Sequence, residues 1–263
     1  MKGLLSLFDL VSFLLPGFLF LGILELITEN NLFPSITQIT PIPLLIYAGI
    51  AYILGQAVDS CSQFFIEQLI IKKWLGHPAY YLIRQRRVGR VFSIFFREYC
   101  SPLPKPIRDK LLKRATKDGI DNLSESVPET EGKSIKNEKK GRITSAKNSA
   151  IIFFDTTYHL AIKEFKRDLS LLLMKEFFLK YNFARNAAFV AFIGFVLTII
   201  GTTMNPLGEF KTLSLEDCLL LAVPLIFVFV TLFFRLLKFY RLYAYELLTA
   251  YASVDGHQGV GFY

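Results

Sequence analysis

Cysteine and histidine are both scarce in this sequence. Its 263 residues include three cysteines and three histidines, which are far apart and share no metal-ligand spacing: Cys61, Cys100, Cys218, His77, His159 and His257. No CxxC pair occurs. Zinc sites and disulfide frameworks depend on such pairs and on regular spacings. The scarcity argues against both, and we expect no bound metal.

The common catalytic motifs are also missing. The sequence has no GxSxG, P-loop, HExxH or Rossmann fingerprint. The arginine-x4-histidine motif of HEPN ribonucleases is absent too, because the residues five positions before the three histidines are Lys72, Phe154 and Ala252. A nucleophilic enzyme needs a base beside its serine or cysteine, and three scattered histidines indicate none. We therefore expect no enzymatic activity and no cofactor.

Hydrophobic residues, in contrast, are abundant and unevenly placed. They make up 52% of the chain, which has 26 phenylalanines, whereas a soluble domain typically has about 45–50% apolar residues. The excess lies in long runs near both ends. Residues 72–185 carry a net charge of +13 and the rest of the chain −5, which together give the formal +8. This asymmetry indicates contact with anionic lipid or nucleic acid, or a membrane orientation signal.

Long apolar runs predict membrane-spanning helices. A bilayer core requires about 20 apolar residues per helix, and four runs approach that length: Leu4–Ile27, Ile42–Ser60, Ala187–Thr203 and Cys218–Leu237. A cleavable signal peptide is the alternative for the first run, since Lys2 precedes it. However, the run is too long for a signal sequence and ends without a small-x-small cleavage site. We expect it to stay as the first span, kinked at Pro16.

The distribution of cations predicts the orientation of these spans. Loops 28–41 and 204–217 carry a single cation, Lys211, whereas the N-terminus, the central region and the C-terminal end carry all the others. Because cytoplasmic loops carry the excess of lysine and arginine, both termini and the central region are predicted to be cytoplasmic.

The predicted organisation has three parts. Residues 1–75 form a transmembrane hairpin whose second helix extends into the cytoplasm, 76–186 a basic cytoplasmic region, and 187–263 a second hairpin with a C-terminal amphipathic helix. The second helix should end at Gly76-His77-Pro78, because glycine suits a left-handed cap and proline cannot continue a helix. Residues 124–149 have almost no large apolar side chain and are predicted to be disordered. The fold class is therefore all-α, with four spans and a helical, partly disordered cytoplasmic region between spans 2 and 3.

A heptad pattern runs through residues 158–183 of the cytoplasmic region. Its apolar positions alternate in steps of four and three, with Glu176 as the polar exception: Tyr158, Ile162, Phe165, Leu169, Leu172, Leu179 and Phe183. This spacing predicts a helix that packs along one seam. The seam packs either against the extended second helix of the same subunit or against another subunit.

Polar side chains follow one stripe of the second helix. At positions 0, +3, +4, +7 and +11 they are Gln56, Asp59, Ser60, Gln63 and Glu67. Ionisable groups at membrane depth usually face a bundle interior or water. The stripe is therefore a candidate pore lining, supported by Asp9 at a similar predicted depth. The alternative is that Asp59 and Glu67 lie outside the bilayer on an ordinary solvated face.

Two groups of cations mixed with aromatic residues are candidate ligand sites. The first lies in the central region and the second at the end of the fourth span: Arg84, Arg86, Arg87, Arg90, Arg235, Lys238 and Arg241. Cations among aromatic rings suit the phosphates and bases of nucleotides or single-stranded oligonucleotides. Stop-transfer anchoring by snorkelling side chains is the other explanation for the second group.

Four segments carry a resemblance to known proteins: FDLVSFLLPG at 8–17, GQAVDS at 55–60, Arg185-Asn186, and the segment from Phe239-Tyr240-Arg241 to Glu246-Leu247-Leu248. They resemble bacterial four-span membrane proteins encoded with antiphage defence systems, among which the Hailong-type effectors are the named candidate. The resemblance implies an oligomeric, ion-channel-like effector in the bacterial inner membrane that depolarises an infected cell. It also implies a gate that responds to an oligonucleotide, and a partner enzyme that makes this ligand.

Two functional hypotheses follow. The first is a homo-oligomeric membrane effector or channel controlled by a cytoplasmic nucleotide or oligonucleotide. The second is a membrane anchor or scaffold that transports nothing and recruits a partner through its basic region. Both imply contact with membrane lipid.

Overall fold

The computed structural model describes seven ranges of the chain: residues 2–27, 41–83, 96–117, 153–154, 156–158, 169–203 and 214–253. Within residues 2–11, 41–42 and 169–171 it describes the helical backbone but not the side chains. Every element in these ranges is a helix, and none of them contains a strand. The predicted all-α class is confirmed for the described chain.

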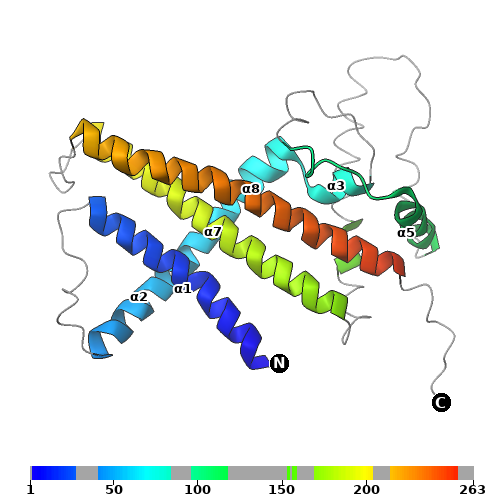
Figure 1. Ribbon diagram of the computed structural model, residues 1–263. Helices are drawn as coiled ribbons and strands as arrows, with labels where there is room; N and C mark the ends of the chain where they lie inside the picture. Colours follow the sequence, from blue (N-terminus) through cyan, green and yellow to red (C-terminus); the bar gives the residue numbers. More distant parts are fainter. Residues whose placement is uncertain are drawn as a thin grey trace, which may run out of the picture. The chain divides into compact units, whose positions relative to one another are not determined.

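The described ranges contain seven helices of six or more residues (Figure 1): α1 (Lys2–Ile27), α2 (Pro41–Ser62), η2 (Gln63–Leu75), α3 (Pro78–Ile83), α5 (Lys105–Lys117), α7 (Leu169–Thr203) and α8 (Leu215–Ser253). Three helical segments in the described ranges are long and apolar enough to cross a membrane: Pro43–Ile83, Leu172–Gly201 and Leu215–Ser253. A shorter apolar stretch, Ser12–Ile27, belongs to α1. The composition of these helices is that of a membrane protein, with three candidate spans.

The chain divides into two compact units. The first combines Met1–Ile70 with Leu179–Leu237, and the second combines Ile71–Phe178 with Lys238–Tyr263. The first unit therefore contains α1, α2 and parts of η2, α7 and α8. The second contains α3, α5 and the remaining parts of the long helices.

In the first unit, α1 and α2 cross at two glycines (Figure 1). A β-carbon at Gly17 would overlap the carbonyl of Ala51, and one at Gly55 would overlap the carbonyl of Phe13. The two backbones are therefore in direct contact at this crossing. Small residues allow this close approach in membrane helices, where dispersion rather than the hydrophobic effect holds helices together.

Helix α7 packs against both α1 and α8 in the same unit. A β-carbon at Gly194 would lie 2.9 Å from Ile23 of α1 and 3.5 Å from Leu225 of α8. The rings of Phe192 and Phe229 are 5.4 Å apart. The four apolar helices thus share one interior.

The buried side of α7 differs from the predicted heptad seam. Met174, Tyr181 and Arg185 are buried, whereas Leu172 is exposed and Leu179 and Phe183 are half-buried. Of the other seam positions, Ile162 and Phe165 lie outside the described residues and the side chain of Leu169 is not described. Tyr158 belongs to the short helical segment at 156–158. The seam as a contact between subunits stays a prediction.

The second helix continues past Ser62 as a π-helix, η2, with its wider i→i+5 hydrogen bonding. The buried positions in this region are Ser62, Ile66, Ile71 and Leu75. They follow steps of four, five and four residues, whereas an α-helix has 3.6 residues per turn. The buried side therefore stays continuous only because the helix widens.

The helix ends where the sequence predicts. Gly76 adopts a φ of 89°, the left-handed conformation that glycine tolerates best, and α3 begins at Pro78. Tyr81 donates a hydrogen bond to the Leu75 carbonyl, and Tyr99 donates one to the Gly76 carbonyl at 2.9 Å. The carbonyls at this helix end are therefore satisfied by buried tyrosines.

The second unit has an aromatic interior. The His77 ring contacts Phe154 and Tyr240, with centroids 4.8 and 5.2 Å apart. The basic helix α5 is fixed by Arg114, which donates to the Tyr251 carbonyl at 2.7 Å and lies 4.4 Å from the centroid of the Tyr251 ring.

Candidate functional site

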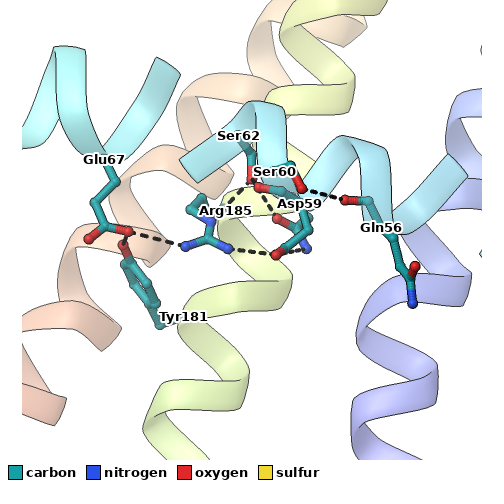
Figure 2. Close-up of polar contacts among 8 residues, drawn as sticks. Gln56, Asp59, Ser60, Ser62, Glu67, Tyr181 and Arg185 are labelled. Atoms are coloured by element: carbon teal, nitrogen blue, oxygen red, sulfur yellow. Dashed lines mark hydrogen bonds and ion pairs between the residues drawn. The ribbon is translucent and has the colours of Figure 1, made fainter. Parts of the chain in front are cut away.

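The candidate site is a charged network centred on Arg185 of α7. Its side chain is 5% exposed, and all three nitrogens of its guanidinium make hydrogen bonds (Figure 2). Nη2 donates to Asp59 Oδ1 at 2.6 Å, Nη1 to Glu67 Oε2 at 3.2 Å, and Nε to the Ser62 hydroxyl at 3.1 Å. Arg185 therefore joins α7 to the end of α2 and to the start of η2.

Neutral groups complete the network. The side-chain amide of Asn186, which is fully buried, donates to Asp59 Oδ1 at 2.9 Å and accepts from the Ser62 hydroxyl at 2.7 Å. The Tyr181 hydroxyl donates to Glu67 Oε2 at 3.1 Å, and the Tyr181 ring lies 5.5 Å from the Arg185 guanidinium carbon. Buried polar groups are costly unless paired, and each of these has a partner.

The π-helix is what brings Glu67 to this network. Glu67 is eight positions after Asp59. In an α-helix with 3.6 residues per turn, eight positions are more than two full turns, so the two side chains would point in different directions. The wider turn that begins at Gln63 removes this difference. Both carboxylates then lie on the side of the helix that faces Arg185. π-helical turns often occur at functional sites for this kind of realignment.

The network carries an excess of negative charge. Two carboxylates share one guanidinium, and their side chains are 26% and 16% exposed for Asp59 and Glu67. Asp59 follows the start of α2 by 18 residues, which at 1.5 Å per residue is about 27 Å. That distance is close to the thickness of about 30 Å of a bilayer's hydrocarbon core. The network therefore lies near one end of the apolar part of the helix.

The predicted polar stripe separates into two groups in the structure. Asp59 and Glu67 are paired with Arg185, whereas Gln56, Ser60 and Gln63 are exposed. The Ser60 hydroxyl donates to the Gln56 carbonyl of its own helix at 3.1 Å. In Figure 2 the Gln56 side chain points away from Arg185. The second helix therefore has a paired polar side and an open polar side.

The predicted ligand-binding cations are described only in part. Arg84, Arg86, Arg87 and Arg90 lie outside the described residues. On α8, the side chains of Arg235 and Lys238 are exposed.

Arg241 has a structural contact instead. It donates to the Ser101 hydroxyl at 2.6 Å and to the Ser101 carbonyl at 3.3 Å, and its Nε is buried without a hydrogen-bond partner among the described residues. Of the predicted α8 cations, Arg235 and Lys238 are the exposed ones.

Metal-ligating side chains and one thiol can be assessed in the described ranges. No group of three histidine, cysteine or acidic residues there is arranged to hold a metal ion. Burial raises the pKa of Cys100 to about 11, so this thiol is protonated at neutral pH. Asp9, a predicted neighbour of the polar stripe, lies in the part of α1 without described side chains.

Sequence reasoning missed the centre of the network. It singled out Asp59 and Glu67, but it used Arg185 and Asn186 only as one segment of the resemblance and did not consider Tyr181. A signal existed, because Arg185 precedes the third apolar run just as Asp59 ends the second, which places both at one predicted depth.

Comparisons of the chain with protein-family models, with curated proteins and with solved structures found no match.

Proposed function

We propose that this protein is a homo-oligomeric, channel-like membrane protein in which the open polar side of the second helix lines an ion path shared by several subunits. The observation that carries the proposal is the exposure of Gln56 and Gln63 on a helix whose other exposed side chains are mostly apolar. An unpaired polar side chain in an apolar environment costs about 1–3 kcal/mol. Water or another subunit must therefore cover this side of the helix in the membrane.

The charged network gives such a path a preference for cations. Each subunit contributes two carboxylates and one guanidinium at the end of α2. A ring of subunits would then carry one excess negative charge per subunit beside the path. Rings of acidic side chains favour cations in other pores. The role assigned to Arg185 is to hold both carboxylates in place without neutralising the site.

The proposed membrane arrangement has four spans: the three long apolar segments and, in addition, α1. Helix α1 has 26 residues, about 39 Å at 1.5 Å per residue, which is long enough to cross a bilayer. Its glycine crossing with α2 supports a position beside α2 in the membrane. The distribution of cations supports both termini and the central region in the cytoplasm, as in a bacterial inner-membrane protein.

The proposed control of the path is a cytoplasmic anionic ligand, either a nucleotide or an oligonucleotide. The exposed cations Arg235 and Lys238 and the basic central region support this assignment. The resemblance to four-span antiphage effectors supports a role in which opening depolarises the membrane of an infected cell. In that role a partner enzyme would supply the ligand.

Ion flux from vesicles that contain the purified protein tests the proposal. We expect efflux of potassium or sodium ions, beyond that of protein-free vesicles, that changes when single-stranded oligonucleotides or nucleoside triphosphates are added. Native mass measurement of the detergent-extracted protein should show an oligomer. A stable oligomer that conducts no ion under any ligand condition would contradict the channel and favour a membrane anchor that recruits a partner.

A further inference from the structure

The second helix has an exposed apolar edge that continues past its polar residues. Phe64, Leu69 and Trp74 of η2 are exposed by 53%, 38% and 79%. They follow one another in steps of five residues, so they lie on neighbouring turns of the π-helix. Fully burying a large apolar side chain contributes about 1.5–3 kcal/mol. An edge of three such residues in water would therefore be unfavourable.

This edge is separate from the polar side described above. In an α-helix each residue advances by about 100°, so Ile53, Ala57 and Phe64 lie beside Gln56, Ser60 and Gln63 rather than on top of them. All six are exposed. The helix thus presents two adjacent exposed edges, one polar and one apolar.

The length of the apolar edge exceeds the hydrocarbon core of a bilayer. Its exposed residues run from Ile46 in α2 to Trp74 in η2. These two residues are 28 positions apart, which at 1.5 Å per residue is about 42 Å. A bilayer measures about 30 Å across its hydrocarbon and about 40–45 Å with its head-group layers. The far end of the edge therefore corresponds to a head-group layer.

The residues at that end have the composition of a membrane interface. Trp74 is the only tryptophan of the chain, and Lys72 and Lys73 beside it are exposed. Tryptophan favours the head-group layer, where its ring is partly apolar and its N–H can reach polar groups. Lysines in this layer interact with anionic phospholipid head groups.

We infer that η2 is a membrane contact rather than a cytoplasmic extension, and that Trp74 lies in the anionic head-group layer with Lys72 and Lys73. This assignment differs from the sequence expectation that the helix leaves the membrane near Ser60. It does not depend on whether the protein conducts ions. The occupant of the edge is phospholipid, so neither water nor a second copy of the chain covers Trp74.

The fluorescence of Trp74 tests this inference directly, because no other tryptophan contributes. The full chain is reconstituted into vesicles of phosphatidylcholine and phosphatidylglycerol, with part of the lipid brominated at a chosen depth. We expect bromine near the head-group end of the acyl chains to cause a large loss of emission, and bromine near the methyl end a smaller one. Trp74→Phe, which should abolish the signal, is the control for background emission.

Three results would overturn the assignment. Strong quenching by aqueous acrylamide with none by brominated lipid would place Trp74 in water. Protection from both quenchers would place a second copy of the chain over it. Stronger quenching by the deeper bromine would place it in the hydrocarbon core. Lys73→Glu provides a second arm, because it should reduce the quenching by brominated phosphatidylglycerol while leaving that by brominated phosphatidylcholine nearly unchanged.

Discussion

Two helix junctions in the first unit are held together in opposite ways. The crossing of α1 and α2 depends on Gly17 and Gly55, where the absence of side chains lets the backbones touch. The junction of α7 with the second helix depends on Arg185, Asp59 and Glu67, three charged groups in one hydrogen-bonded network. One junction depends on shape and the other on charge.

The difference shows which junction is suited to change. A glycine crossing has no polar group and is held by dispersion, which falls off when the backbones separate slightly. The groups of a charged network can exchange one another for water, ions or a ligand, because each group can be hydrated or paired again when it is released. A moving part of this protein is therefore expected at the Arg185 junction, with the glycine crossing as the fixed part.

The largest effect is expected from Arg185→Met. This change removes the only cation of the network and leaves Asp59 and Glu67 without their charged partner. Breaking a buried ion pair in this way typically costs about 3–5 kcal/mol. The measurement is the free energy of unfolding in mixed detergent micelles.

Two further variants sharpen this result. Arg235→Met removes an exposed arginine of α8 and should change stability by no more than about 0.5 kcal/mol. Combining Arg185→Met with Asp59→Asn and Glu67→Gln removes all three charges and should recover much of the lost stability. If Arg185→Met alone were as stable as the wild type, the network would not hold this junction.

The next effect is expected at the glycine crossing. Gly17→Ala and Gly55→Ala each place a methyl group against a backbone carbonyl that cannot move aside. Overpacking of this kind costs typically 1–3 kcal/mol, and we expect about 2–3 kcal/mol here. The same unfolding measurement applies.

Gly22 and Gly49 are matched controls for the crossing. They lie in the same two helices, and a β-carbon at either would meet nothing within 4 Å. Alanine there should stabilise the helix by about 0.5–1 kcal/mol. Equal destabilisation by all four substitutions would mean that the crossing is not where the structure places it.

The sequence predicts where the helices of these junctions begin and end much better than it predicts which residues pair between them. Apolar runs and the Gly76-His77-Pro78 stop are local, and η2 does end at Leu75 with Gly76 at positive φ. The pairing of Arg185 with Asp59 joins residues 126 positions apart. Such a pair follows from helix packing, which no local pattern specifies.

The π-helix is a second reason for the incomplete site prediction. An α-helical period places Glu67 on one stripe with Gln56, eleven residues earlier. The widening from Gln63 onward turns Glu67 toward Arg185 and leaves Gln56 on the open side. Packing of Ile66, Ile71 and Leu75 accompanies this widening, and a single periodicity along the helix cannot represent it.

A smaller difference in stability is expected between variants of the two carboxylates. Asp59 accepts from Arg185 at 2.6 Å and from Asn186 at 2.9 Å, whereas Glu67 accepts at 3.2 Å and 3.1 Å. Shorter charge-assisted hydrogen bonds are stronger. Asp59→Asn should therefore cost about 1–2 kcal/mol and Glu67→Gln less. The ranking is checked by unfolding each variant under the same conditions, and the reverse order would assign the stronger pairing to Glu67.

The smallest effect on stability, and the sharpest on function, is expected from Gln56→Leu and Gln63→Leu. Both side chains are exposed, and that of Gln56 points away from Arg185 (Figure 2), so stability should stay within about 0.5 kcal/mol of the wild type. If they line a path, an apolar leucine should dewet it and reduce ion flux from vesicles severely. Ala57→Leu is the matched control, because it adds a leucine to the adjacent apolar edge and should leave the flux unchanged. A conducting wild type whose flux survives both glutamine substitutions would place the path elsewhere and leave the open polar side as a contact between subunits.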